Sequence, residues 1–207
     1  MGSSIPRWEW RTFGSTFGPA EARMRAYPFQ LRHSSETYIV SDRSDVNAKI
    51  RDQLLDIKAL QQIDTHRLEL WLPVTKAGFP LTASDLDRTF RDWGLEPPAL
   101  AAQARTPAEF LDDVVRPQSS LTVVNVAKQR YGFAIDDCLV EIADLTLDGT
   151  PLRTIAVEMA DPDRVWRTVN TLGLSGYENV NYVKTLKRFL SAHTRSARQP
   201  APGRARL

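Results

Sequence analysis

The sequence predicts an α+β protein built on an antiparallel β-barrel of about eight strands, with helices inserted midway and at the C-terminus. In several short β-rich segments, charged and apolar residues alternate, so each strand has one charged face and one apolar face. Turn residues separate these segments at hairpin spacing. The apolar period then changes to that of a helix in the middle and at the end of the chain.

The first strand shows this alternation most clearly, over residues 7–11. Arg7, Glu9 and Arg11 occupy one face, and Trp8 and Trp10 occupy the other. We expect the two tryptophans to pack on the outside of the sheet beneath helices, with stacking on a substrate base as the alternative.

Four further strands are expected before the helical insertion, at 36–41, 46–52, 54–58 and 67–72. Each of the last three again places its charged residues on one face and its small or aliphatic residues on the other. Their charged or polar faces carry Asn47, Lys49, Arg51, Asp56, Lys58, Arg67 and Glu69, and Trp71 shares the last of them.

Helices are predicted where capping residues precede an apolar pattern of helical period. Thr82 or Ser84 begins one that Gly94 ends, Thr106-Pro107 begins a second, and Asp161-Pro162 begins a third. A last amphipathic helix is expected from about Tyr177 to Leu190, and a short helical piece is compatible with residues 20–26.

A second block of strands follows the insertion, at 121–133, 138–147 and 152–159. Asp148-Gly149 is a strong hairpin signal between the last two. These strands carry Lys128 and Arg130, then Glu141 or Asp144, and finally Glu158.

The composition is that of a globular domain: 42% of the 207 residues are hydrophobic and 25% are charged. The formal charge of +2 does not indicate nucleic-acid binding, and no apolar run reaches the roughly 20 residues needed to span a bilayer. We expect one folded domain over 1–192 and a disordered basic tail over 193–207, where arginines lie among Ser, Pro, Gly and Gln.

The only cysteine, Cys138, excludes an internal disulfide and fits a reducing, cytoplasmic location. It lies in an apolar strand, so we expect a buried thiol rather than a nucleophile. His33, His66 and His193 are scattered, which gives no support to a zinc site or a Cys/His dyad. The oligomeric state is left open, including a homodimer.

Alternation shows which residues share a face but not which face is inside. If the charged faces are solvated, the apolar faces form the core of a sandwich. If they point inward, the cations need a polyanion, because buried charges are costly unless paired and arginine stays protonated. Interspersed carboxylates would then hold a hard divalent cation that bridges to phosphate oxygens.

The order of these motifs resembles the CYTH family, the triphosphate tunnel metalloenzymes, over roughly residues 5–190. Arg7-x-Glu9-x-Arg11 lies where that family has Glu-x-Glu-x-Lys. Lys49-x-Arg51, Lys58, Arg67-x-Glu69 and Lys128-x-Arg130 are similar to its later basic and mixed strands, Glu158 to its closing acidic pair, and Asn181-Tyr182 to its ending.

The resemblance implies an antiparallel tunnel that binds triphosphate with Mg²⁺ or Mn²⁺ and hydrolyses inorganic triphosphate or short polyphosphate. Water would attack a terminal phosphoryl group with help from the metal. By position, it implies catalytic roles for Lys58, Glu9 and Glu158, and metal binding by Glu9, Glu69, Glu141, Asp144 and Glu158. It implies substrate binding by Arg7, Arg11, Lys49, Arg51, Lys58, Arg67, Lys128 and Arg130.

Departures from the family pattern keep a second interpretation open. Arg7 replaces the first acid, Trp71 replaces a later one, and the closing pair keeps a single acid. A binding module for polyphosphate or nucleotide with a degenerate metal site is therefore the alternative. A cyclase would need a base-recognition feature that the sequence lacks, and the modest net charge argues against RNA binding.

If these cations are crowded on inward faces, they repel one another when no ligand is bound, and removing one of them relieves that repulsion. Lys49→Ala or Arg130→Ala is expected to reduce triphosphate affinity strongly and to leave thermal stability equal or higher.

Overall fold

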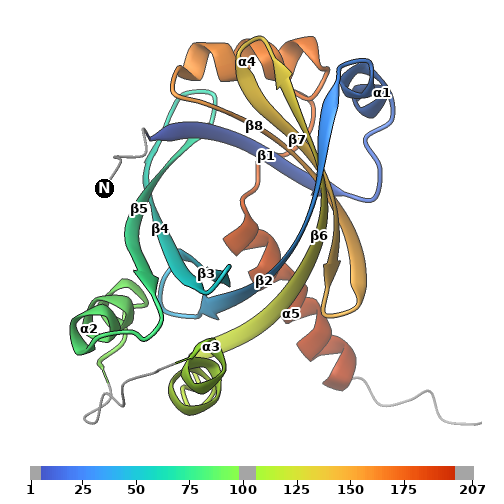
Figure 1. The fold of residues 1–207 in the computed structure, drawn as a ribbon. Coiled ribbons are helices and arrows are strands. Elements are labelled where there is room, and N and C mark those ends of the chain that lie inside the picture. Colours follow the sequence, from blue (N-terminus) through green and yellow to red (C-terminus); the bar gives the residue numbers. More distant parts are fainter. Residues whose placement is uncertain (1–5, 98–105, 199–207) are drawn as a thin grey trace, which may run out of the picture.

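The computed structural model describes residues 6–97 and 106–198, and it confirms the closed antiparallel barrel of eight strands (Figure 1). Around the barrel the strands follow the order β1-β5-β4-β3-β2-β6-β7-β8. Their bounds are β1 Arg7–Gly14, β2 Phe29–Ser41, β3 Asn47–Arg51, β4 Leu54–Ile63, β5 Glu69–Gly78, β6 Leu121–Ile135, β7 Cys138–Leu147 and β8 Thr150–Met159.

Strand β2 is longer than the sequence predicted, because it begins at Phe29 and not at Glu36. It pairs with β6 along its whole length, from Phe29 opposite Phe133 to Ser41 opposite Leu121. The added residues 29–35 are mixed and mostly exposed, so their hydrophobic pattern is weak and only the pairing with β6 makes them a strand.

The helices begin where the capping residues predicted. Thr82 caps α2 (Ala83–Asp92) in a reciprocal capping box with Asp85, and Thr106 caps α3 (Pro107–Glu109), which continues as a π-helix over Phe110–Val115. Asp161 caps α4 (Pro162–Thr171), and α1 spans Pro19–Arg25.

The apolar faces of the strands point outward and are covered by helices. Trp10 packs under α4 against Val165 and Val169, as predicted for the outer face of β1. On the other side of the barrel, Ile57 packs against Phe90 of α2 and Phe110. The sandwich with solvated charged faces is thereby excluded, because the cores lie outside the barrel wall.

A third apolar cluster fills one end of the barrel interior, where α5 (Tyr182–Arg198) crosses behind the strands (Figure 1). Tyr182 and Leu186 pack there against Tyr38 and Val126. This helix starts five residues later than predicted because Asn181 caps it: its Oδ1 accepts from the backbone N–H of Lys184 at 2.9 Å.

Residues 193–198 lie within the bounds of α5, and the rest of the tail expected over 193–207, residues 199–207, lies outside the described residues. Among the described helices, none has the length and apolar character to cross a membrane.

Candidate functional site

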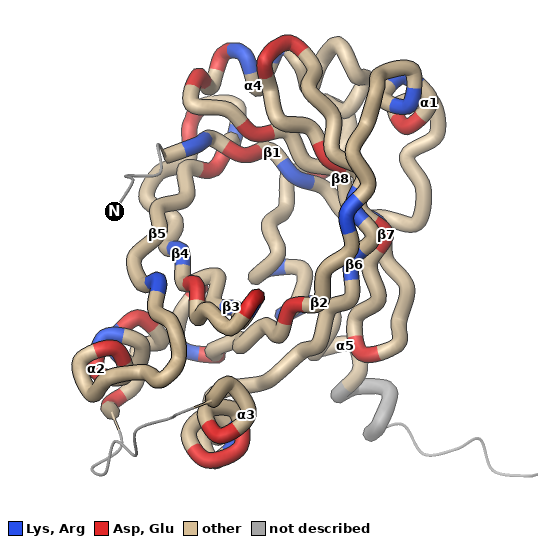
Figure 2. Tube along the Cα trace, in the orientation of Figure 1, with Lys and Arg blue, Asp and Glu red and all other residues tan. Residues whose placement is uncertain are grey.

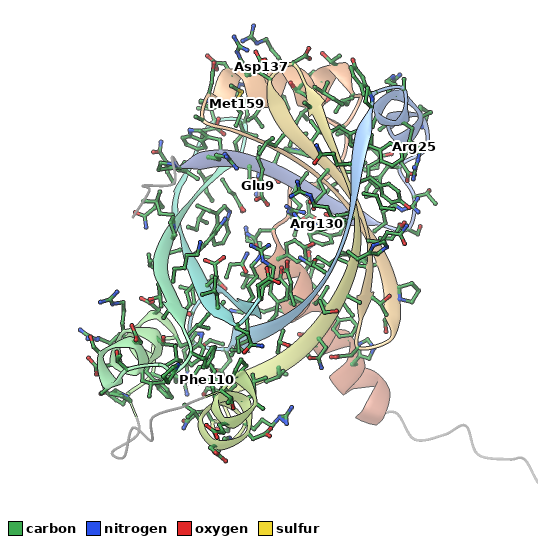
Figure 3. The ribbon with its side chains drawn as sticks, in the orientation of Figure 1. Glu9, Arg25, Phe110, Arg130, Asp137 and Met159 are labelled. Atoms are coloured by element: carbon green, nitrogen blue, oxygen red, sulfur yellow. The ribbon has the colours of Figure 1, made fainter. Side chains whose placement is uncertain are left out.

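The charged faces of the strands converge on a cavity of about 160 Å³ inside the barrel. Figure 2 shows Lys, Arg, Asp and Glu on the strands around the opening, and in Figure 3 the labelled Glu9 and Arg130 lie at its border. Six bases and five acids line it, namely Arg11, Lys49, Arg51, Lys58, Lys128 and Arg130, with Glu9, Glu36, Asp56, Glu141 and Glu158. Asn47, Tyr38, Trp71, Asn181 and Tyr182 complete the lining.

Arg11 is the centre of the first charge cluster and is only 6% exposed. Its Nε lies 2.6 Å from Glu9 Oε1, and its two terminal nitrogens lie 3.8 Å from Glu141 Oε1 and 3.5 Å from Glu158 Oε1. The guanidinium also lies over the ring of Tyr182, at 4.7 Å from its centroid. The single guanidinium group of Arg11 thus forms ion pairs with carboxylates from β1, β7 and β8.

Arg130 extends this cluster along the barrel wall. Its Nε and Nη2 lie 2.7 Å and 2.6 Å from Glu141 Oε2, so both nitrogens approach the same carboxylate oxygen.

Glu36 is the centre of a second cluster, which the sequence reading did not identify. This carboxylate is 2% exposed, and its Oε2 lies 2.8 Å from Lys128 Nζ and 3.2 Å from Lys49 Nζ. Arg51 Nη1 lies 3.3 Å from Oε1, and the Tyr38 hydroxyl donates to Oε2 at 2.9 Å.

Glu36, Lys49 and Lys128 of this second cluster are all charged at pH 7. Burial opposes ionisation of Glu36, but Lys128 and Lys49 together hold its pKa well below the usual value. Burial lowers the pKa of both Lys49 and Lys128 to about 8 despite Glu36. An anion with more charge than one carboxylate could therefore bind to Lys49, Arg51 and Lys128 together.

Glu9 and Glu158 are direct neighbours across the β1–β8 ladder. Burial and the nearby Glu9 raise the pKa of Glu158 to about 7, whereas the charge and hydrogen bond of Arg11 outweigh burial and lower the pKa of Glu9. Two adjacent carboxylates in this state would gain from a further cation.

We expect Glu158→Gln to make the metal-free protein more stable above pH 7 and to leave it unchanged below pH 4.5, the ordinary value for Glu158. The folded wild type binds this proton more tightly than the unfolded chain, so the contribution of Glu158 to stability is fully present below pH 4.5 and is lost as the pH rises through about 7. Thermal unfolding in a chelator across this range checks it. Parallel curves for wild type and variant would contradict it.

Lys58 lines the cavity on β4 and has no ion-pair partner within 4.0 Å among residues 6–97 and 106–193. Its positive charge favours the ionised form of both Glu9 and Glu158, although burial and Glu9 still raise the pKa of Glu158 overall. Lys58 therefore lies near the acidic pair. It is a cation that a ligand could contact without first breaking an ion pair.

The inner cavity leads to a wider hollow of about 490 Å³ that shares Arg130, Glu141 and Glu158 with it. Arg7 and Arg32 also line this outer hollow, and both are exposed. Arg7 therefore lies at the mouth of the barrel and not in the inner cavity with Glu9 and Arg11.

Arg67, Glu69 and Asp144 are predicted site residues that line neither the inner cavity nor the outer hollow. Arg67 is exposed in the turn before β5. Asp144 points outward, where its carboxylate pairs with Arg153 Nε at 2.6 Å; Glu141 and not Asp144 lines the cavity. Neither Arg67 nor Asp144 lines the inner cavity or the outer hollow, contrary to the inward position expected for both.

Glu69 is buried behind the cavity wall and is already saturated with donors. Its oxygens accept from Asn181 Nδ2 at 2.9 and 3.0 Å and from the Trp71 indole N–H at 3.1 Å. Lys184 Nζ lies 3.4 Å away. Glu69 thus joins β5 to the start of α5, and we leave it out of the proposed metal ligands.

The segment before α5 closes one end of the barrel. The backbone N–H of Arg11 donates to Asn179 Oδ1 at 2.8 Å, and its carbonyl accepts from Val180 N–H at 2.7 Å. Asn181 and Tyr182 line the inner cavity, and the outer hollow that Arg7 and Arg32 line adjoins the cavity at Arg130, Glu141 and Glu158.

Among the described residues, no group of three or more His, Cys, Asp or Glu side chains is placed to hold a metal ion. Glu9 and Glu158 still offer two adjacent carboxylates, and Mg²⁺ is commonly bound by one or two carboxylates together with substrate phosphates and water. The residues present therefore fit a metal that arrives with a phosphate ligand. Cys138 is buried, and burial raises the pKa of its thiol, as expected for a structural cysteine.

No protein-family model and no curated protein matches the sequence. Solved structures that align with it include a Hippeastrum protein described as an adenylyl cyclase candidate with a dominant triphosphatase activity. It is 10% identical, with a TM-score of 0.48 over 88% of this chain and 96% of its own. A Bacillus halodurans adenylate cyclase candidate is 12% identical, with a TM-score of 0.46 over 88% and 98%. A Pyrococcus horikoshii protein is 12% identical, with a TM-score of 0.47 over 86% and 98%. At these scores we base no functional conclusion on the matches.

Proposed function

We propose that the protein binds inorganic triphosphate or a short polyphosphate, together with Mg²⁺ or Mn²⁺, inside the barrel and hydrolyses its terminal phosphoryl group. The observation that carries this proposal is the inward set of six Lys and Arg side chains around one enclosed cavity. The sequence resemblance to the triphosphate tunnel metalloenzymes supports the same ligand class.

The charge balance of the cavity explains why a metal would be needed. Six bases against five acids leave a formal charge of only +1 when all are ionised. A triphosphate carries several negative charges, so the lining alone cannot neutralise it. Divalent cations that enter with the ligand supply the missing positive charge, and Glu9 and Glu158 are the carboxylates that would hold one of them.

The size of the cavity favours an inorganic chain over a nucleotide. Its 160 Å³ is below the roughly 300–1,000 Å³ of pockets that enclose drug-sized molecules. A phosphate chain fits this space, whereas a nucleoside would have to remain in the outer hollow. This argues against a cyclase, which must hold the ribose next to the reacting phosphate.

In the proposed reaction a water oxygen bonds to the terminal phosphorus as the bond to the bridging oxygen breaks. The electron pair of that bond passes to the leaving diphosphate, and the water proton is released to solvent or to the products. Arg11 and Arg130 would stabilise the negative charge on the phosphoryl oxygens, and Lys58 would stabilise the negative charge that develops on the leaving diphosphate.

A second candidate is a binding module that does not turn over its ligand. The lack of a third metal-ligating side chain among the described residues, and Trp71 in the cavity wall, favour it. Both candidates predict binding, so phosphate release separates them.

The decisive experiment is a phosphate-release assay with tripolyphosphate, longer polyphosphate, ATP and thiamine triphosphate, each with Mg²⁺ or Mn²⁺ and with a chelator. We expect release from tripolyphosphate that requires metal and is lost in Glu9→Gln, because that change removes a proposed metal ligand. Binding without release would support the module, and the absence of binding would refute both.

A further inference from the structure

The cluster around Glu36 has a composition that the hydrolysis of triphosphate does not explain. Two ammonium groups, one guanidinium and one phenol converge on a single buried carboxylate. These donors are the ones that proteins use to hold phosphate oxygens.

Glu36 is also separate from the acids that would bind a metal. Glu9, Glu141 and Glu158 share Arg11, whereas Glu36 shares none of its three cations with them. The cavity therefore contains an acidic cluster around one arginine and a basic cluster around one glutamate.

We propose that Glu36 is an internal competitor for the polyanion: it occupies Lys49, Arg51 and Lys128 until a ligand with enough phosphate oxygens displaces it. This inference rests on the proposed function, since it names a residue that sets affinity at the same site. It makes Glu36 a specificity-determining residue.

Competition by a tethered carboxylate would select for long phosphate ligands. Glu36 is held in the barrel wall at a high effective concentration, so a small anion such as orthophosphate gains too little to replace it. A triphosphate can contact Lys58, Arg11 and Arg130 at the same time, which offsets the displacement of Glu36. After hydrolysis, the return of the carboxylate would favour release of short products.

A purely structural role for Glu36 makes a different prediction. In both cases Glu36→Gln lowers stability without ligand, because the buried Lys128 and the partly buried Lys49 and Arg51 lose their counter-charge. If Glu36 only positions the cations, the variant also binds polyanions more weakly. If Glu36 competes, the variant binds them more tightly.

Isothermal titration calorimetry with imidotriphosphate and Mg²⁺ measures the affinity of wild type and variant. Imidotriphosphate is used because its P–N–P links resist hydrolysis. The buffer is kept more than one unit below the pKa of about 8 of Lys49 and Lys128, so that both are charged. We expect Glu36→Gln to bind about tenfold more tightly or better, since charge-assisted hydrogen bonds to the carboxylate no longer have to be broken. Orthophosphate binding should gain by a larger factor, so that the variant prefers triphosphate over orthophosphate less strongly than wild type does.

Glu36→Asp is the second variant, and it decides the question if Glu36→Gln does not fold. Aspartate keeps the charge but is one methylene shorter, so it holds the three cations less well, and a smaller gain is expected. Glu21→Gln is the matched control, because Glu21 pairs with Arg153 at 2.8 Å outside the barrel. Its affinity should equal that of wild type.

Weaker binding by Glu36→Gln, or by Glu36→Asp where only that variant folds, overturns the inference while the proposed ligand class stands. Binding by the variants but not by wild type would support it in its strongest form. If wild type and all variants fail to bind, the proposed function is wrong and this inference falls with it.

Discussion

Replacing Arg11 with methionine is expected to lower the free energy of unfolding by about 3–5 kcal/mol, the range measured when one partner of a buried charge pair is removed. Arg11 is 6% exposed and is the cation shared by Glu9, Glu141 and Glu158. Without it, three partly buried carboxylates from neighbouring strands face one another in the cavity. Urea denaturation at neutral pH in a chelator measures the loss.

The loss should shrink in acid, because protonated carboxylates no longer repel. Arg153→Met is the matched control: Arg153 also pairs with two carboxylates, Asp144 and Glu21, but outside the barrel. We expect it to cost about 1 kcal/mol, as for more exposed ion pairs. An Arg11→Met variant as stable as this control would show that the first cluster contributes little to the fold.

Much of the barrel could be predicted because alternation is a local property of each strand. Lys49 and Arg51 share a face of any strand that contains them, and so do Asp56 and Lys58. What alternation could not decide was which face is inside, since that depends on the helices that cover the other face. Trp10 under α4 and Ile57 under α2 settle it.

Glu36 was missed because its partners are brought to it only by strand pairing. In the sequence it begins a β-rich stretch with no alternating charge. In the barrel, β2 lies between β3 and β6, so Glu36 meets Lys49 on one side and Lys128 on the other. A single strand gives no information about such neighbours.

The choice between Glu141 and Asp144 illustrates a signal that was present. Asp144 shares a face with Val140 and Ile142, which pack in the outer core, whereas Glu141 shares the inner face with Ala143 and Leu145. Both faces of β7 are largely apolar because α5 fills one end of the interior, so the sequence pattern alone was ambiguous.

Glu36 also changes what we expect from removing a cation. Lys49→Ala and Arg130→Ala were predicted to leave stability equal or higher, on the premise of crowded, unpaired cations. Lys49 instead pairs with Glu36, and Arg130 pairs with Glu141. We now expect a modest loss of stability for each, with the predicted fall in triphosphate affinity unchanged.

The largest effect on affinity is expected for Lys128→Met. Lys128 is 6% exposed, lies 2.8 Å from Glu36 and donates to the Tyr38 hydroxyl at 2.9 Å. We expect imidotriphosphate to bind about 100-fold more weakly, because truncating one partner of a buried charged contact costs roughly 2–5 kcal/mol. Titration calorimetry measures it, and Lys187→Met, which removes a lysine paired with Asp45 near α5, is the control.

Combining Lys128→Met with Glu36→Gln separates stability from binding. In the single variant Lys128→Met, Glu36 keeps Lys49 and Arg51 but loses its nearest cation, so the protein is less stable. The double variant should be less stable than Lys128→Met, because Lys49 and Arg51 then also lose their counter-charge, and it should still bind more weakly than Glu36→Gln alone. If the double variant instead binds as tightly as Glu36→Gln, Lys128 serves only to neutralise Glu36, and the phosphate cradle consists of the other cations.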